Sequence, residues 1–240
     1  MASRTIVGIG GFPNPRMFEY VLAQARGRRV LVDTTASPQA VDRAADFAEL
    51  DAEVTLLSFY PWPPEDLRAQ ALAADVILVC GGNTANMLAV WRVHGFDRIL
   101  REAWQSGVVL AGWSAGMICW FEAGVTDSFG PQGAPEGAPI FRPGAGGSAA
   151  GASSPELEGM RDGLGLLPGS ACPHYDGEEQ RRPVYTRLVR EGFPAGIALD
   201  DGAGAHFSGT DLVEVVASLP GAGGYRVGPA GEEPFSVRML

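Results

Sequence analysis

A serine flanked by glycines stands between an apolar run and a helical pattern. Residues 112–116 read Gly-Trp-Ser-Ala-Gly, after the run Val-Val-Leu-Ala at 108–111. A strand, a sharp turn and a helix in this order form a nucleophile elbow, in which small flanking residues admit a strained serine. The turn presents the Ser114 hydroxyl at a helix N-terminus, where the N–H of Ala115 points toward a tetrahedral oxyanion. The pattern predicts a nucleophilic serine, with a plain glycine-rich turn as the alternative.

A second glycine-rich turn follows another apolar run. Residues 81–84 read Gly-Gly-Asn-Thr and open a further helical pattern. A phosphate site is disfavoured because no Lys or Arg follows closely, whereas a simple helix cap by Asn83 or Thr84 stays open. The carboxyl ends of parallel strands meet at one edge of a sheet. We therefore expect the N–H of Gly82 to serve as a second oxyanion donor beside Ser114.

A catalytic serine needs a base, and the chain has only three histidines. His174 lies in Cys-Pro-His-Tyr-Asp at 172–176, where a short apolar run passes into a loop, so it is the expected base. A structural hydrogen bond in a turn is the alternative. His94 ends a helical pattern, which favours a helix cap or a surface position. His206 lies in a strand pattern, which favours a packed or partly exposed neighbour.

The carboxylate that orients the base has several candidates. Asp200 and Asp201 follow the apolar run 196–199, and Asp127 lies in Gly-Val-Thr-Asp-Ser at 124–128. Adjacent aspartates also form ordinary turns, so the residues favour Asp201 over Asp127 only modestly. The order Ser, His, Asp differs from the Ser, Asp, His order of α/β-hydrolases, which indicates a different fold.

The first half of the chain predicts the elements that must position these residues. Short β-branched runs alternate with amphipathic segments, as in a doubly wound α/β fold whose mostly parallel sheet has helices on both faces. The expected strands are 5–10, 29–34, 53–59, 75–80 and 108–112, and the expected helices are 15–26, 38–50, 64–73, 85–91 and 96–105. In such a sheet, reactive groups gather at the carboxyl ends of the strands.

The second half contains a compositional break. Residues 130–154 are rich in Gly, Ala, Pro and Ser and lack large apolar residues, which predicts a long loop rather than a linker between domains. A single domain over 1–240 is therefore expected. The tail 223–240 predicts a β-hairpin between 224–227 and 234–239.

Composition excludes several classes of function. The chain has 18 basic and 28 acidic residues and a formal net charge of −10, which disfavours binding to nucleic acid or to an anionic membrane. No apolar run approaches the roughly 20 residues that span a bilayer, so a cytoplasmic location is expected. Cys80, Cys119 and Cys172 lie in apolar stretches and predict buried free thiols. No acidic pair stands at ligand spacing from a histidine, so neither a metal nor a cofactor is expected.

Taken together, the motifs at 81–84, 112–116, 173–174 and 200–202 resemble the dipeptidase E (peptidase E) and cyanophycinase family of serine peptidases over most of the chain. The resemblance implies a class I glutamine-amidotransferase-like fold, a small peptide substrate and a homodimer. An amidotransferase itself is disfavoured because the elbow holds a serine and Cys119 lies more than a turn away.

The resemblance also assigns roles in the site. It implies Ser114 as nucleophile, His174 as base, and Gly82 and Ala115 as oxyanion donors. The third triad member is then Asp201, where family members commonly carry Glu. Asp127 matches an acidic position near the family's site and is assigned a supporting role, and Asn83 is expected in the substrate pocket.

One segment departs from the family pattern. Residues 177–181 read Gly-Glu-Glu-Gln-Arg and resemble the family's Thr-Arg-Glu-Gln-Arg stretch, with Glu178 where an arginine binds the substrate's N-terminal aspartate. Juxtaposed like charges in a partly desolvated pocket cost on the order of several kcal/mol, which removes the usual Asp-X specificity. Alternatively, Glu178 is solvated and Arg181 or Arg182 takes over.

The expected function is therefore that of a serine peptidase that works through an acyl-enzyme. Two alternatives remain open: a peptidase or amidase for non-acidic N-terminal residues, and a non-catalytic homologue that only binds peptides.

Overall fold

The structure is a computed structural model that describes residues 4–37, 47, 51–130 and 156–240. The expected helix 38–50 and the expected loop 130–154 thus lie almost wholly outside the described residues. In the first half the elements are β1 (Thr5–Ile9), α1 (Pro15–Leu22), β2 (Arg29–Asp33), β3 (Glu53–Leu57), α2 (Leu67–Ala73), β4 (Val76–Val79), α3 (Thr84–His94), α4 (Phe96–Gln105) and β5 (Val109–Trp113). The later elements are α5 (Ala115–Ile118), β6 (Phe121–Thr126), β7 (Glu158–Met160), β8 (Leu167–Cys172), α6 (Arg181–Arg190), β9 (Gly196–Leu199), β10 (Ala203–Ser208), β11 (Asp211–Ala217), β12 (Gly224–Gly228), β13 (Gly231–Pro234) and β14 (Val237–Met239).

The first sheet has eight strands in the order β14-β11-β10-β1-β5-β4-β2-β3. The strands β1, β5, β4, β2 and β3 are parallel to their neighbours within this set, and β10 joins β1 in the antiparallel direction. Each strand expected in the first half is present. The predicted α/β class with a mostly parallel core is confirmed.

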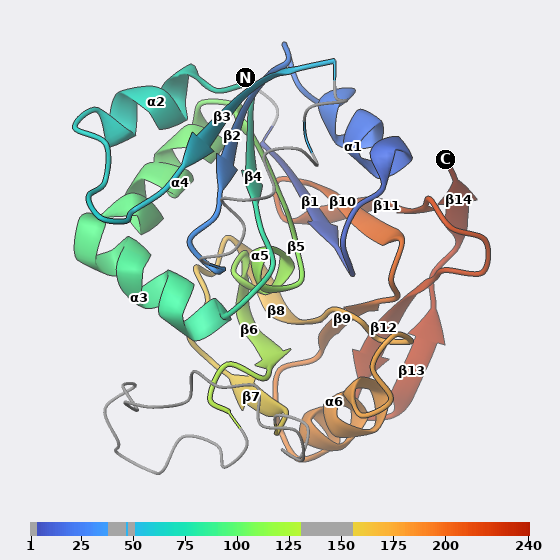
Figure 1. The fold of residues 1–240 in the computed structure, drawn as a ribbon. Coiled ribbons are helices and arrows are strands. Elements are labelled where there is room, and N and C mark those ends of the chain that lie inside the picture. The colour runs from blue at the N-terminus through green and yellow to red at the C-terminus, as the bar shows by residue number, and fades with distance from the viewer. Residues whose placement is uncertain (1–3, 38–46, 48–50, 131–155) are drawn as a thin grey trace, which may run out of the picture.

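Period-two alternation along these strands produces two apolar faces. Ile77 and Leu110 lie in one buried cluster with residues of α2, α3 and α4, whereas Leu78 and Val109 lie in another with residues of α1. Figure 1 shows α2, α3 and α4 gathered on one side of the sheet and α1 on the other. Side chains on a strand alternate between its faces, so continuous apolar runs require helices on both.

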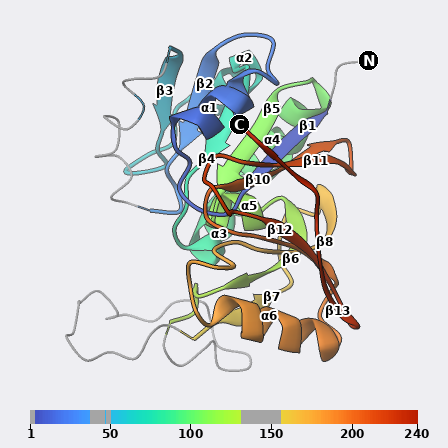
Figure 2. The same cartoon turned by 90° about the vertical axis from the view of Figure 1, so that its right-hand side faces the viewer.

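A second sheet completes the fold. It has six strands in the order β13-β12-β9-β8-β6-β7. Residues of α6 share a buried cluster with Val125, Cys172 and Ala198 of this sheet. Figures 1 and 2 both show the second sheet and α6 at the end of the molecule away from α1 and α2. The chain crosses to this sheet through α5, which has only four residues, so the helix expected after Ser114 is short.

The C-terminal hairpin is formed by β12 and β13, which pair from Tyr225 with Pro234 to Gly228 with Gly231. The expected pairing of 224–227 with 234–239 is therefore wrong beyond Pro234. The last strand, β14, instead pairs in parallel with β11 of the first sheet. The physical reason is the distribution of apolar side chains: Val237 packs against the main core, while β13 is exposed throughout.

The three cysteines are buried thiols that form no disulfide within the described residues, as predicted. The longest helix in the described ranges, α3, has 11 residues. Across those same ranges, no helix combines the length and the apolar character that a bilayer span requires.

A buried carboxyl group stands at the end of β2. Asp33 is fully buried, and its Oδ1 accepts a hydrogen bond of 2.5 Å from the Thr35 hydroxyl. Its Oδ2 has no hydrogen-bond partner among the described residues. Because burial disfavours the charged form, it raises the pKa of Asp33 to about 7.

We expect Asp33→Asn to change the pH dependence of stability. The folded protein holds the Asp33 proton more tightly than the unfolded chain, so this contribution to stability is full below the unfolded pKa of 3.8 and is lost as the pH rises through about 7. Asparagine keeps an acceptor for Thr35 and does not ionise. Denaturant unfolding should show the variant gaining more than about 1 kcal/mol on the parent between about pH 5 and pH 8. A difference that is independent of pH would mean that Asp33 does not titrate in this range.

Candidate active site

Ser114 occupies the turn between β5 and α5 with φ 54° and ψ −114°. A positive φ is uncommon for a residue with a side chain and marks local strain. The Ser114 N–H donates to the Ile9 carbonyl at 3.2 Å, and its carbonyl accepts from Met117 at 2.9 Å. Ser114 is thus the N-cap of α5, and the N–H of Ala115 belongs to the first turn, which has no acceptor within the helix.

The glycines on either side of the elbow are required by packing. A Cβ on Gly112 would lie 2.4 Å from the Gly116 carbonyl oxygen, and a Cβ on Gly116 would lie 2.2 Å from the carbonyl oxygen of Val79. Both distances are far below van der Waals contact. The turn therefore tolerates no side chain at either position.

The second glycine-rich turn lies against the elbow. A Cβ on Gly81 would lie 3.1 Å from the Cβ of Ser114 and 2.8 Å from Nε1 of Trp113. Gly82 has φ 142°, and a Cβ there would lie 2.3 Å from the Ala36 carbonyl oxygen. Only glycine fits both positions, and the structure brings Gly82 and Ala115 to the same sheet edge as Ser114.

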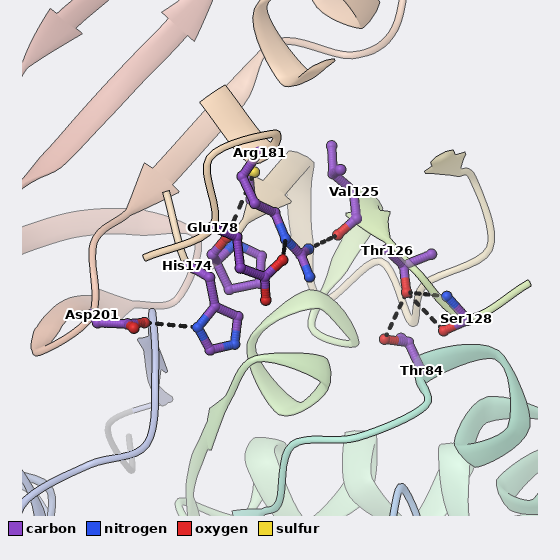
Figure 3. Close-up of polar contacts among 10 residues, drawn as sticks. Thr84, Val125, Thr126, Ser128, His174, Glu178, Arg181 and Asp201 are labelled. Atoms are coloured by element: carbon purple, nitrogen blue, oxygen red, sulfur yellow. Dashed lines mark hydrogen bonds and ion pairs between the residues drawn. The ribbon is translucent and has the colours of Figure 1, made fainter. Parts of the chain in front are cut away.

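Asn83 acts as the helix cap that the sequence left open. Its Oδ1 accepts from the Asn86 N–H at 2.9 Å, and its Nδ2 donates to the Ser128 carbonyl at 2.9 Å. Figure 3 shows the neighbouring hydroxyls of Thr84, Thr126 and Ser128 in contact.

Asp127 follows β6, one residue beyond Thr126. Its side chain forms no hydrogen bond with the part of the chain that the structure describes. The structure therefore places Asp127 beside the hydroxyl cluster of Thr126 and Ser128 rather than in contact with His174, and its supporting role stays a prediction.

His174 and Asp201 are in direct contact. The Nδ1 atom of His174 lies 2.7 Å from Oδ1 of Asp201, as Figure 3 shows. The side chains are 20% and 45% exposed, so the pair stands at the surface of a partly open site. His174 also has a positive φ, 54°. Of the aspartates considered from the sequence, Asp201 is the one that meets His174.

The neighbouring Asp200 faces away from His174. It is buried, and its Oδ2 accepts from the Gly223 N–H at 2.9 Å. Burial raises the pKa of Asp200 to about 6, and the charge of Asp176 acts in the same direction. Two adjacent aspartates thus have different environments.

The end of β1 holds Ser114 and His174 together. The N–H of Ser114 goes to the Ile9 carbonyl at 3.2 Å, and the N–H of His174 goes to the next carbonyl, that of Gly10, at 3.3 Å. The Ser114 hydroxyl itself has no hydrogen-bond partner within the described ranges. The main chains of Ser114 and His174 are therefore fixed at one strand end, while their side chains form no hydrogen bond with each other.

Gly10 and Gly11, after β1, leave room for the turn at Asp200 and Asp201. A Cβ on Gly11 would lie 2.1 Å from Asp201 Oδ1, and a Cβ on Gly10 would lie 2.2 Å from the Asp200 carbonyl oxygen. Sequence reasoning missed both glycines. The available signal was a Gly-Gly pair directly after the first strand, at the edge where site residues gather.

Glu178 is paired rather than free. Its Oε2 accepts from Nε of Arg181 at 2.6 Å, and the Nη1 of Arg181 donates to the Val125 carbonyl at 2.8 Å. The Arg181 side chain is 3% exposed, whereas that of Glu178 is 45% exposed. Arg181 is therefore committed to internal contacts, and the expectation that it could replace the missing arginine is not supported by this geometry.

Arg182 is also occupied. Its guanidinium lies 4.8 Å from the centre of the Tyr175 ring and 4.7 Å from that of Tyr225. It pairs with Glu232 at 2.9 Å. The Arg182 guanidinium is thus engaged by cation–π contacts and an ion pair within the protein.

The other histidines are engaged elsewhere. His94 is the last residue of α3, and its ring centre lies 5.2 Å from that of Phe59. His206 Nδ1 lies 2.9 Å from the Tyr20 hydroxyl. The positions expected for both histidines from the sequence are confirmed.

Sequence comparison identifies the family. The model of Peptidase family S51 matches residues 35–215. The chain belongs to peptidase family S51. It is 40% identical over 249 residues to the Bacillus subtilis (strain 168) protein named "Uncharacterized peptidase YgaJ", covering 98% of this chain and 97% of that protein. The resemblance to peptidase E is confirmed, and the chain is a peptidase of that type.

Solved structures of other peptidases share the fold. A peptidase from an acI-B1 Actinobacterium aligns with a TM-score of 0.63 at 16% identity, covering 97% of this chain and 94% of that one. A putative peptidase E protein from Listeria monocytogenes EGD-e aligns with a TM-score of 0.61 at 18% identity, covering 91% of this chain and all of that one (100%). At these identities the likeness concerns the fold alone.

The Glu178–Arg181 pair gives a test of stability. Glu178→Gln leaves the buried Arg181 guanidinium without its opposite charge, so we expect the free energy of unfolding to fall by about 1 to 3 kcal/mol. Glu179→Gln, a neighbouring exposed position with the same change of charge, should stay within about 0.5 kcal/mol of the parent. Urea denaturation of both variants measures the difference. Equal stabilities would show that Glu178 does not compensate the charge of Arg181.

Proposed function

We propose that this peptidase hydrolyses small peptides by a serine mechanism with Ser114 as nucleophile, His174 as base and Asp201 as the orienting carboxylate. One observation carries the proposal: the hydrogen-bonded pair of His174 and Asp201 is attached to the same strand end that receives the N–H of Ser114. A strained serine at a helix N-terminus beside such a pair has the arrangement that acyl transfer requires.

In the proposed reaction, His174 Nε2 takes the hydroxyl proton of Ser114 while Oγ attacks the peptide carbonyl carbon. The carbonyl oxygen becomes an oxyanion that accepts hydrogen bonds from the N–H groups of Gly82 and Ala115. His174 then returns the proton to the leaving amine as the C–N bond breaks. Water, deprotonated by His174, attacks the acyl-enzyme and releases the acid and Ser114.

Asp201 supports this scheme although its side chain is one methylene shorter than Glu. The 2.7 Å contact with His174 Nδ1 is within normal hydrogen-bond range. Gly11 and Gly177 allow it, because a Cβ at these positions would lie 2.1 Å and 2.5 Å from the two carboxylate oxygens of Asp201. The shorter acid therefore reaches the imidazole without strain from neighbouring side chains.

Ser114→Ala provides the direct test of the nucleophile. We expect hydrolysis of the best dipeptide to fall by at least about 1,000-fold, because no covalent intermediate can form. A fluorophosphonate probe should label the parent at Ser114 and leave the variant unlabelled, as read by intact-protein mass spectrometry. A parent that binds dipeptides but is neither labelled nor active would support the alternative of a non-catalytic peptide-binding homologue.

We further propose that the substrate carries a non-acidic N-terminal residue. Glu178 stands near His174 with a half-exposed carboxylate, and the two nearby guanidinium groups, of Arg181 and Arg182, are held by internal partners. An aspartate side chain in this region would meet the half-exposed carboxylate of Glu178, while both guanidinium groups are already engaged with other partners. Neutral and basic side chains carry no such penalty.

A dipeptide panel tests this specificity. We expect kcat/KM for neutral or basic N-terminal residues to exceed that for Asp-X by at least about tenfold, which corresponds to about 1.4 kcal/mol of discrimination. The same panel measured with Ser114→Ala removes any contribution from contaminating peptidases. If Asp-X dipeptides are the best substrates of the parent, the specificity proposal is wrong while the serine mechanism stands.

A further inference from the structure

Asp176 makes a contact that the proposed mechanism does not use. It lies two residues after His174, in the segment between β8 and α6, and its side chain is exposed. Its Oδ1 accepts a hydrogen bond of 2.8 Å from the backbone N–H of Asp201. An exposed carboxylate thus binds the main chain of the residue that contacts His174.

The two contacts form a closed ring. The His174 side chain meets the Asp201 side chain at 2.7 Å, and the Asp201 backbone meets the Asp176 side chain at 2.8 Å. A backbone hydrogen bond of 3.1 Å from Tyr175 to the Leu199 carbonyl lies between them. The segment 174–176 holds the segment 199–201 through the Asp176 side chain, and the second segment holds the first through the Asp201 side chain. Between these two contacts, the main chains of Tyr175 and Leu199 are joined by a hydrogen bond.

The Asp201 carboxylate lies beside two glycines, so no side chain at these positions fixes its direction. The Asp201 side chain is 45% exposed, and the residues packed against the carboxylate include Gly11 and Gly177, which have no side chains. The direction of the Cα–Cβ bond, and hence the position of the carboxylate, depends on how the backbone at Asp201 is held. The hydrogen bond from the Asp201 N–H to Asp176 Oδ1 is one constraint of this kind.

We propose that Asp176 is a positioning residue of the triad, which holds the backbone of Asp201 so that its carboxylate orients His174. The inference rests on the proposed serine mechanism. Asp176 acts through Asp201 and does not touch the substrate. The positioning role requires an acceptor oxygen at the position of Asp176 Oδ1 and does not require its negative charge.

Kinetics of three variants test the inference on the best dipeptide of the parent. Asp176→Ala removes the acceptor, and we expect kcat to fall about tenfold or more with KM within about twofold, because a misplaced base slows the chemical step. Asp176→Asn keeps an oxygen acceptor without the charge and should restore kcat to within about threefold of the parent. Glu179→Ala, an exposed acidic residue of the same segment, is the matched control and should have the kcat of the parent.

Several outcomes overturn the inference. It fails if Asp176→Ala has the kcat of the parent, if its effect is on KM alone, or if Asp176→Asn is as impaired as Asp176→Ala. Should Asp176→Ala not fold, Asp176→Glu takes its place, since the charge is kept but the acceptor is displaced by one methylene. A kcat of Asp176→Glu equal to that of the parent would then reject the positioning role.

A readout without turnover separates this inference from the serine mechanism. We expect the proton between His174 Nδ1 and Asp201 to give a resonance far downfield in the one-dimensional proton NMR spectrum. This resonance should broaden or vanish in Asp176→Ala and persist in Asp176→Asn. If the parent is not labelled by a fluorophosphonate, the mechanism fails. If the parent is labelled but Asp176→Ala shows the parent's resonance and labelling rate, only the positioning role fails.

Discussion

The carboxyl end of β1 makes contacts with all the residues of the proposed triad. Its successive carbonyls at Ile9 and Gly10 accept from the backbones of the nucleophile and the base, and Gly11 lies against the Asp201 carboxylate. The pairing of β1 explains this position, since β5 runs parallel on one side and β10 antiparallel on the other. The elbow that follows β5 and the turn that precedes β10 therefore both lie at the carboxyl end of β1.

The two sheets contribute different parts of the site. The first sheet supplies Ser114 and the two glycine-rich turns, which are buried deeply enough that added Cβ atoms would collide with backbone. The second sheet supplies the base and its partner, because β8 and β9 are parallel neighbours and the turns after them meet. In the proposed reaction, the position of His174 relative to Ser114 then depends on how firmly the second sheet is held at the end of β1.

Charge is arranged so that the cations near His174 are structural. Arg181 is buried and needs both Glu178 and a backbone carbonyl, since an unpaired buried guanidinium is costly. Arg182 is held between tyrosine rings and by Glu232. Among the described residues near the base, Asp176 and Glu178 are exposed carboxylates, which is the ground on which we propose a preference against acidic substrates.

The sequence by itself determined the features that depend on local pattern. Alternating apolar runs predicted the parallel strands and the helices on both faces, and the glycines around Ser114 predicted the strained turn, because backbone sterics act between near neighbours. Local pattern left Asp201, Asp200 and Asp127 as alternatives, and only the family resemblance pointed to Asp201, which the structure places against His174. Tertiary structure alone decided that β14 leaves the hairpin for the first sheet and that Arg181 is buried. These outcomes depend on contacts between residues far apart in the chain, whose energies no local spacing encodes.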